Sequence, residues 1–213
     1  MKLNSKDLLL YLVTDRRWLK NETLPDVVEK AIKNGVSFVQ LREKSLDFDK
    51  FKQLALEIKQ ITDLYNIPFV INDNIDIAIE VDADGVHIGQ GDLDVEKARK
   101  YIGEEKILGV SVGDIKEALD AENKGADYLG ITIFPTMSKA DAISVNLEKL
   151  KEIKSNVNIP VIAIGGIKED NLHLLKPSKI DGIAVISAIL AKDDIEEAAK
   201  NLRRIAKKYL GNK

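Results

Sequence analysis

The chain contains no cysteine and only two histidines among its 213 residues. The absence of cysteine excludes disulfide bonds, a thiolate metal site and a cysteine nucleophile. No apolar run approaches the length of about 18 residues that indicates a transmembrane helix. The N-terminus also lacks the pattern of a secretory signal peptide. The sequence therefore predicts a cytoplasmic protein that does not act at a membrane.

A strong charge of either sign is also absent, since the net charge is only −3. Nucleic-acid binding requires a basic surface, which this balance does not supply. Apolar residues make up 45% of the chain and charged residues 31%, as is typical of a globular protein. We expect small-molecule ligands rather than nucleic acid, and the sequence leaves a homo-oligomer open.

Eight short apolar segments rich in valine and isoleucine recur along the chain. Most are apolar almost throughout, which is typical of parallel strands covered on both faces. The segments span residues 8–15, 38–43, 68–73, 84–89, 107–112, 128–134, 160–166 and 181–188.

Segments with helical periodicity lie between these strands. Asp47 and Asp94 occupy expected N-cap positions, and Gly35 and Gly125 stand where helices should end. No proline- or serine-rich linker divides the chain. The pattern predicts an α/β protein, a single (β/α)8 TIM barrel domain spanning residues 1–213.

Polar residues follow the predicted strands, at the end where such barrels carry their chemistry. Asp73 and Asp92, without histidine or cysteine partners, are suited to Mg²⁺. Arg42, Lys44 and Lys139 supply positive charge for a polyanion. Glycine-rich loops after the last two strands favour phosphate binding through backbone N–H groups.

Four further side chains have competing interpretations. His87 lies inside a strand, so we expect it to pack in the barrel and bond a neighbour, with a catalytic base as the alternative. Glu43 should point away from the cavity as an ion-pair partner. Ser111 stands at the end of a strand, and no general base is evident beside it. Trp18 either covers the site or simply packs.

The segments that carry these residues resemble the thiamine-phosphate synthase family. They are YLVTD, VQLREK, VINDN, ADGVHIGQGD, LGVSV, GADYLG, FPTMSK, VIAIGGI and DGIAVISAI. They follow the family order over residues 11–189. QLREK and GVHIGQ are specific together, whereas GADY and IGGI occur in many barrels.

The resemblance implies a transferase that joins two small phosphorylated substrates with Mg²⁺ as cofactor. The implied reaction couples 4-amino-2-methyl-5-pyrimidinylmethyl diphosphate with 4-methyl-5-(2-phosphoethyl)thiazole, or its 2-carboxy form, to give thiamine phosphate and diphosphate. The implied pyrimidine diphosphate contacts are Gln40, Leu41, Arg42, Glu43, Lys44, Asn72, Ser111 and Lys139. The implied thiazole phosphate contacts are Thr136, Met137, Ser138, Gly166, Ile186 and Ser187. Catalysis is implied for Arg42, Lys44, Ser111 and Lys139, and Mg²⁺ ligation for Asp73 and Asp92.

One segment departs from the family pattern. GITIFPTMSK replaces GVGPVFPTxTK and is one residue shorter. We expect the deletion to be absorbed at Thr132–Ile133, so that Lys139 still faces the cavity.

Three alternatives remain at this point. A thiazole tautomerase-like isomerase would not need Asp73, Asp92 and Lys44. A phosphate-handling barrel of the tryptophan or ribulose-phosphate type would share only the last two loops, and QLREK distinguishes it. The altered segment also makes a non-catalytic phosphate-binding barrel conceivable.

Overall fold

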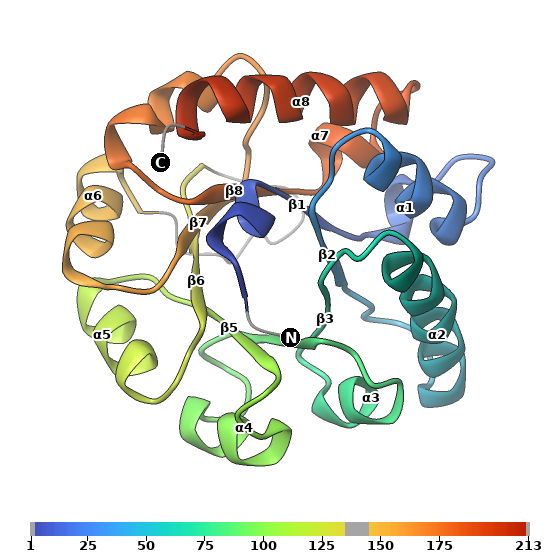
Figure 1. The fold of residues 1–213 in the computed structure, drawn as a ribbon, viewed down its shortest axis with the longest axis horizontal. Coiled ribbons are helices and arrows are strands. Elements are labelled where there is room, and N and C mark those ends of the chain that lie inside the picture. The colour runs from blue at the N-terminus through green and yellow to red at the C-terminus, as the bar shows by residue number, and fades with distance from the viewer. Residues whose placement is uncertain (1–2, 135–144, 212–213) are drawn as a thin grey trace.

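The computed structural model describes residues 3–134 and 145–211, and within them eight parallel strands close into a barrel in chain order (Figure 1). The first strand pairs with the last as well as with the second. The strands are β1 (Leu10–Val13), β2 (Phe38–Leu41), β3 (Phe69–Asn72), β4 (Gly85–Ile88), β5 (Ile107–Ser111), β6 (Tyr128–Thr132), β7 (Val161–Ile164) and β8 (Gly182–Val185). The predicted (β/α)8 fold is confirmed, and each strand lies within one predicted apolar segment.

Helices form a ring around these strands (Figure 1). The α-helices are α1 (Leu24–Lys33), α2 (Phe48–Leu64), α3 (Ile75–Glu80), α4 (Val95–Ile102), α5 (Ile115–Asn123), α6 (Leu147–Asn156), α7 (Ser187–Leu190) and α8 (Ile195–Leu210). The 3-10 helices are η1 (Ser5–Leu9), η2 (Arg16–Trp18) and η3 (Leu172–Ser178). In the described part of the chain, none of them combines the length and the apolar composition that crossing a bilayer requires.

The predicted helix boundaries follow from capping residues. Asp47 accepts the Lys50 N–H at the start of α2, and Asp94 accepts two N–H groups at the start of α4. Gly35 and Gly125, just after α1 and α5, have φ of 114° and 92°. This left-handed region favours glycine because it has no Cβ.

The helical segment between β7 and β8 is a 3-10 helix rather than an α-helix. Pro177 lies inside η3 and has no N–H to donate within an α-helical turn. His173 is exposed on this element.

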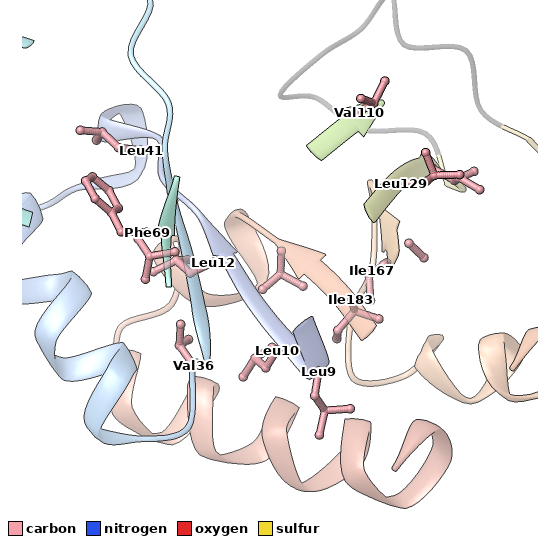
Figure 2. Packing of buried hydrophobic residues seen from close by; sticks show 14 of the residues in the cluster. Leu9, Leu10, Leu12, Val36, Leu41, Phe69, Val110, Leu129, Ile167 and Ile183 are labelled. Carbon is pink, nitrogen blue, oxygen red and sulfur yellow. The ribbon is translucent and has the colours of Figure 1, made fainter. Parts of the chain in front are cut away.

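Two apolar layers hold the barrel together because neighbouring residues of a strand face opposite sides. Leu10, Leu12 and Phe69 are among the buried residues that pack between strands and helices (Figure 2). Tyr11, Phe38 and Tyr128 belong to a separate buried cluster with Leu8 and Ile162. Within the strands, residues of this second cluster alternate with residues of the first, and their side chains fill the interior of the barrel.

Candidate active site

A cavity of about 730 Å³ opens above this interior cluster, at the carboxyl ends of the strands. The predicted site residues that line it are Gln40, Arg42, Lys44, Asn72, Asp73, Asp92, Ser111, Gly166, Ile186 and Ser187. Thr136, Met137, Ser138 and Lys139 lie outside the described residues. Each of the eight strands contributes to the lining, so the structure brings together residues that are far apart in the sequence.

Two predicted pyrimidine contacts have side chains that point away from this cavity. Leu41 is fully buried between the strands and the helices. Glu43 pairs with the Arg16 guanidinium at 2.7 and 2.9 Å, and its side chain is only 4% exposed. The expected ion-pair role of Glu43 is confirmed. A main-chain contact of either residue with substrate stays a prediction.

Arg42 is held at the edge of the cavity by the loop after β1. Its backbone N–H donates to Thr14 Oγ1 at 3.0 Å, and its Nη1 lies 3.8 Å from Asp15 Oδ2. Burial acts to raise the pKa of the Asp15 carboxyl, but hydrogen bonds from Arg17 outweigh it and hold that pKa below its usual range. Asp15 is therefore an ionised partner for both guanidinium groups.

Asp73 and Asp92 lie close enough for their carboxyl groups to interact. Lys44 Nζ is 2.6 Å from Asp73 Oδ2, and the Gly89 N–H donates to Asp92 Oδ2 at 2.7 Å. Asp73 also has a left-handed φ of 63°, which is uncommon for a residue other than glycine. Such backbone strain directs a side chain and often accompanies functional sites.

The electrostatics of this acid pair differ between its members. Burial raises the pKa of Asp92, and the neighbouring Asp73 charge raises it further. Burial also acts to raise the pKa of Asp73, but the Lys44 ammonium outweighs it and the net shift is downward. A divalent cation would relieve the repulsion between the two carboxylates.

The described residues contain no cluster of three acidic, histidine or cysteine side chains that could hold a metal ion. Two carboxylates nevertheless fit Mg²⁺, which usually keeps several waters and binds substrate phosphates. The donor set is oxygen only, as this ion prefers. The residues present are thus compatible with a magnesium site completed by substrate.

His87 packs inside the barrel and bonds two neighbours, as expected. Its Nδ1 is 2.9 Å from Tyr128 Oη and its Nε2 is 2.9 Å from Ser111 Oγ. The sequence did not indicate that an imidazole stands beside Ser111. In the parallel register His87 pairs with Gly109, so the imidazole reaches Ser111 two residues further along β5. Because the second nitrogen of His87 meets a phenol and not a carboxylate, this is no Ser-His-Asp arrangement.

Sequence reasoning missed the two tyrosines beneath the cavity. The Gln40 amide donates to Tyr11 Oη at 2.6 Å, and the hydroxyls of Tyr11 and Tyr128 are 2.8 Å apart. Burial raises the pKa of both phenols far above the usual range, so both stay protonated. A signal was available, since a tyrosine inside an apolar strand needs a partner for its hydroxyl.

The loops after β7 and β8 form the part of the cavity that carries no charge. Gly165 and Gly166 have φ of 88° and 57°, and the Asn171 amide donates to the Gly166 carbonyl at 2.9 Å. Ile186 and Ser187 line the cavity beside them. Main chain at glycine can approach an anion closely because there is no Cβ.

The first residues of the segment that departs from the family, up to Phe134, are described, and they continue the pairing of β6. The Ile133 N–H donates to the Ile164 carbonyl at 2.9 Å, and the Val145 N–H donates to the Thr132 carbonyl at 2.8 Å. The expected position of Lys139 lies outside the described residues and stays a prediction.

A closed parallel barrel whose cavity combines cations, two acids and glycine-rich loops is typical of an enzyme acting on phosphorylated small molecules. Comparison with known proteins narrows this class. The family model described as thiamine monophosphate synthase matches residues 10–189. The chain belongs to this family of transferases.

Individual relatives agree with the family model. The thiamine-phosphate synthase of Clostridium tetani (strain Massachusetts / E88) is 56% identical over 92% of this chain and 94% of its own length. That of Clostridium beijerinckii is 50% identical over 92% of this chain and 95% of its own. The solved thiamine phosphate pyrophosphorylase from Pyrococcus furiosus has a TM-score of 0.90 and 39% identity, covering 97% of this chain and 99% of that one.

Proposed function

We propose that this protein is a thiamine-phosphate synthase. It couples 4-amino-2-methyl-5-pyrimidinylmethyl diphosphate with 4-methyl-5-(2-phosphoethyl)thiazole, or its 2-carboxy form, and releases diphosphate, together with carbon dioxide when the 2-carboxy form reacts. The observation that carries the proposal is one cavity lined both by Arg42 and Lys44 beside two acids and by the glycine-rich loop at Gly166. The diphosphate of one substrate would bind the charged part of the cavity, and the monophosphate of the other would bind the glycine-rich part.

The diphosphate is bound by the charged part of the cavity. Arg42 can offer a bidentate fork to phosphate oxygens, whereas Lys44 acts as a point charge. Lys139 adds a third cation, as the sequence predicts. Asn72, at the end of β3, supplies an uncharged amide beside them.

Asp73 and Asp92 would hold Mg²⁺ against the same diphosphate. When bound, this ion neutralises charge that builds on the leaving group. Lys44, which already contacts Asp73 at 2.6 Å, would lie between the acids and the diphosphate.

The thiazole phosphate is assigned to the loops after β6, β7 and β8. Gly166, Ile186 and Ser187 line this part of the cavity. Thr136, Met137 and Ser138 are the sequence-based additions. Binding here places the thiazole near the pyrimidine and converts a meeting of two molecules into a reaction between oriented groups.

The chemistry follows from what the cavity offers. The bond between the pyrimidine methylene and diphosphate breaks, and the diphosphate leaves with the electron pair. The electron-rich aminopyrimidine stabilises the resulting cation, which the thiazole nitrogen attacks. Arg42, Lys44 and Lys139 stabilise the charge of the leaving diphosphate. Ser111 orients the pyrimidine and does not act as a nucleophile, although His87 lies beside it.

Removal of one acid tests the proposal. Asp92→Ala should lower turnover by about 10²-fold or more while the protein stays folded, because metal neutralisation of a leaving group contributes several kcal/mol. Formation of thiamine phosphate is measured from both substrates with and without Mg²⁺. Asp49→Ala, which removes an exposed aspartate of α2, is the matched control and should couple normally.

Normal coupling by a folded Asp92→Ala variant would contradict the metal assignment. Absence of coupling by the wild-type protein would contradict the proposed function and favour a non-catalytic barrel. Conversion of the thiazole phosphate without the pyrimidine diphosphate would instead favour the isomerase.

A further inference from the structure

We infer that five side chains inside the barrel form one hydrogen-bonded unit that selects the donor and acceptor edge of the aminopyrimidine, with Tyr128 as its central positioning residue. The inference rests on the proposed function, which supplies the aminopyrimidine. The unit runs through Gln40, Tyr11, Tyr128, His87 and Ser111. We call these five residues the barrel relay.

Gln40 determines in which direction the hydrogen bonds of the barrel relay are donated. Its Nε2 donates to Tyr11 Oη at 2.6 Å, so the single hydroxyl hydrogen of Tyr11 points to Tyr128 Oη at 2.8 Å. Tyr128 in turn donates to His87 Nδ1 at 2.9 Å. A neutral imidazole that accepts at Nδ1 carries its proton on Nε2. It therefore donates to Ser111 Oγ at 2.9 Å.

Both ends of the barrel relay line the cavity. In this direction Gln40 keeps its carbonyl oxygen as an acceptor, and Ser111 keeps its hydroxyl hydrogen as a donor. An aminopyrimidine offers the complement, an amino donor next to a ring-nitrogen acceptor. The oxo analogue, with a carbonyl beside a ring N–H, offers the reverse. Binding it would cost one hydrogen bond, because Ser111 Oγ would have to accept from the ring N–H while its own hydrogen lost the ring-nitrogen acceptor.

The surroundings of the barrel relay are built to keep it intact. Tyr11 and Tyr128 are fully buried, so neither hydroxyl can exchange its partner for bulk water at low cost. His87, Gly109 and Tyr128 form one row across β4, β5 and β6. A Cβ on Gly109 would lie 2.2 Å from Tyr128 Cζ and 2.5 Å from His87 Nδ1. Glycine in the middle of this row is what allows the phenol and the imidazole to meet.

The first test is the tautomer of His87 in the free protein. Nitrogen NMR of histidine-labelled protein should show the neutral Nε2–H form, and His173→Gln removes the signal of the only other histidine. Tyr128→Phe should change the His87 nitrogen shifts because Nδ1 loses its donor. Tyr11→Phe should preserve them, since Tyr128 can still donate. A wild-type Nδ1–H form would overturn the inference without any variant, as would unchanged shifts in Tyr128→Phe.

The second test is recognition of the pyrimidine edge. Inhibition by the amino- and oxo-pyrimidine methyl monophosphates, which lack the diphosphate leaving group, gives a preference ratio. Tyr128→Phe should reduce the wild-type preference for the amino form by about tenfold, the effect of one lost hydrogen bond at a buried group. Tyr65→Phe, which removes a tyrosine hydroxyl bonded to Glu29 outside the barrel, is the matched control and should keep the ratio.

An equal ratio in the wild-type protein and Tyr128→Phe would overturn the inference. A wild-type protein that fails to make thiamine phosphate would contradict the proposed function alone. The His87 tautomer and the inhibitor ratio would still decide whether the barrel relay has the direction inferred here.

Discussion

Asp73 and Asp92 divide their negative charge unevenly, and this has a consequence for metal binding. Asp92 has a raised pKa because of burial and the Asp73 charge, whereas the Lys44 ammonium more than offsets burial at Asp73. Protons and Mg²⁺ therefore compete chiefly at Asp92. As the pH falls toward its raised pKa, Asp92 becomes neutral and the site loses half of its carboxylate charge.

We accordingly predict that the Mg²⁺ concentration for half-maximal coupling rises as the pH is lowered toward the raised pKa of Asp92. The direction follows because the protonated carboxyl is the poorer ligand for Mg²⁺. Rates are measured against free Mg²⁺ at each pH, after correction for metal bound by the diphosphate itself. A half-saturating concentration that does not change with pH would mean that Asp92 is not a ligand.

His87 illustrates what the sequence could predict at the scale of one residue. Its place inside an apolar strand was enough to predict a packed, hydrogen-bonded side chain. Its partners Ser111 and Tyr128 are 24 and 41 residues away in the chain, on two other strands. Which residues meet depends on the register between strands, and the local pattern contains no information about that register.

Three strands begin with the same arrangement at the end of the barrel away from the cavity. Asp84, Asp127 and Asp181 precede β4, β6 and β8. Each carboxylate accepts a backbone N–H of the preceding strand, from Phe69, Leu108 and Val161 at 2.8, 2.7 and 2.8 Å. Each aspartate N–H also donates to the carbonyl of that same residue. The three aspartates therefore fix the register of alternate strand pairs.

These aspartates should differ in what they contribute to stability. Asp181 also pairs with Lys154 Nζ at 2.7 Å, and its side chain is only 7% exposed. Asp181→Ala should cost about 3 kcal/mol, because it strips a partly buried ammonium and a backbone donor of their partner. Asp84→Ala, which removes the acceptor of Phe69, should cost about 1 kcal/mol. Urea unfolding of both variants measures the difference.

The contradicting result would be an equal loss in both variants or a larger loss in Asp84→Ala. Coupling activity serves as the control for the fold. It should stay near the wild-type value in both, since neither aspartate lines the cavity.

At the scale of elements the sequence predicted most of the architecture. Strands and capped helices follow from local patterns, such as Asp47 and Asp94 at N-caps, and the structure confirms them. The 3-10 geometry of η3 was not predicted, although Pro177 was visible in the sequence. A proline excludes a regular α-helical turn but does not specify what replaces it.

The whole molecule carries a net charge of −3, yet two cations, Arg42 and Lys44, stand at its cavity beside the two acids. Arg42 and Lys44 have side chains 19% and 57% exposed, so solvent ions can reach both. Such cations attract a substrate of the opposite sign from a distance. Added salt shortens this range, to about 10 Å at 0.1 M and about 3 Å at 1 M.

We therefore predict that the KM for the pyrimidine diphosphate rises with sodium chloride, while kcat changes much less. The physical reason is that screening weakens attraction to the mouth but acts less on groups enclosed with the bound substrate. Initial rates in increasing salt measure both constants, and sucrose of matched osmolarity is the control. A KM that does not depend on salt would show that the mouth does not attract the diphosphate by long-range charge.

The site as a whole could be predicted because barrels of this kind concentrate chemistry at one end. That rule, applied to the eight apolar segments, is enough to group Lys44, Asp73 and Asp92 from the sequence alone, and all three line one cavity. The two tyrosines of the barrel relay were not predicted as site residues, because they lie beneath that end among apolar neighbours.

The pairing of β1 with β8 has a consequence for synthesis on the ribosome. Leu12 lies opposite Val185, so the first strand waits for almost the whole chain before its second edge is covered. Translation at about 5–20 residues per second makes this delay roughly ten to thirty seconds. Throughout that interval the nascent chain offers an apolar strand with unpaired N–H and C=O groups on one side. The first strand to leave the ribosome is the last to be completed, and its open edge is where a chaperone would have most to protect.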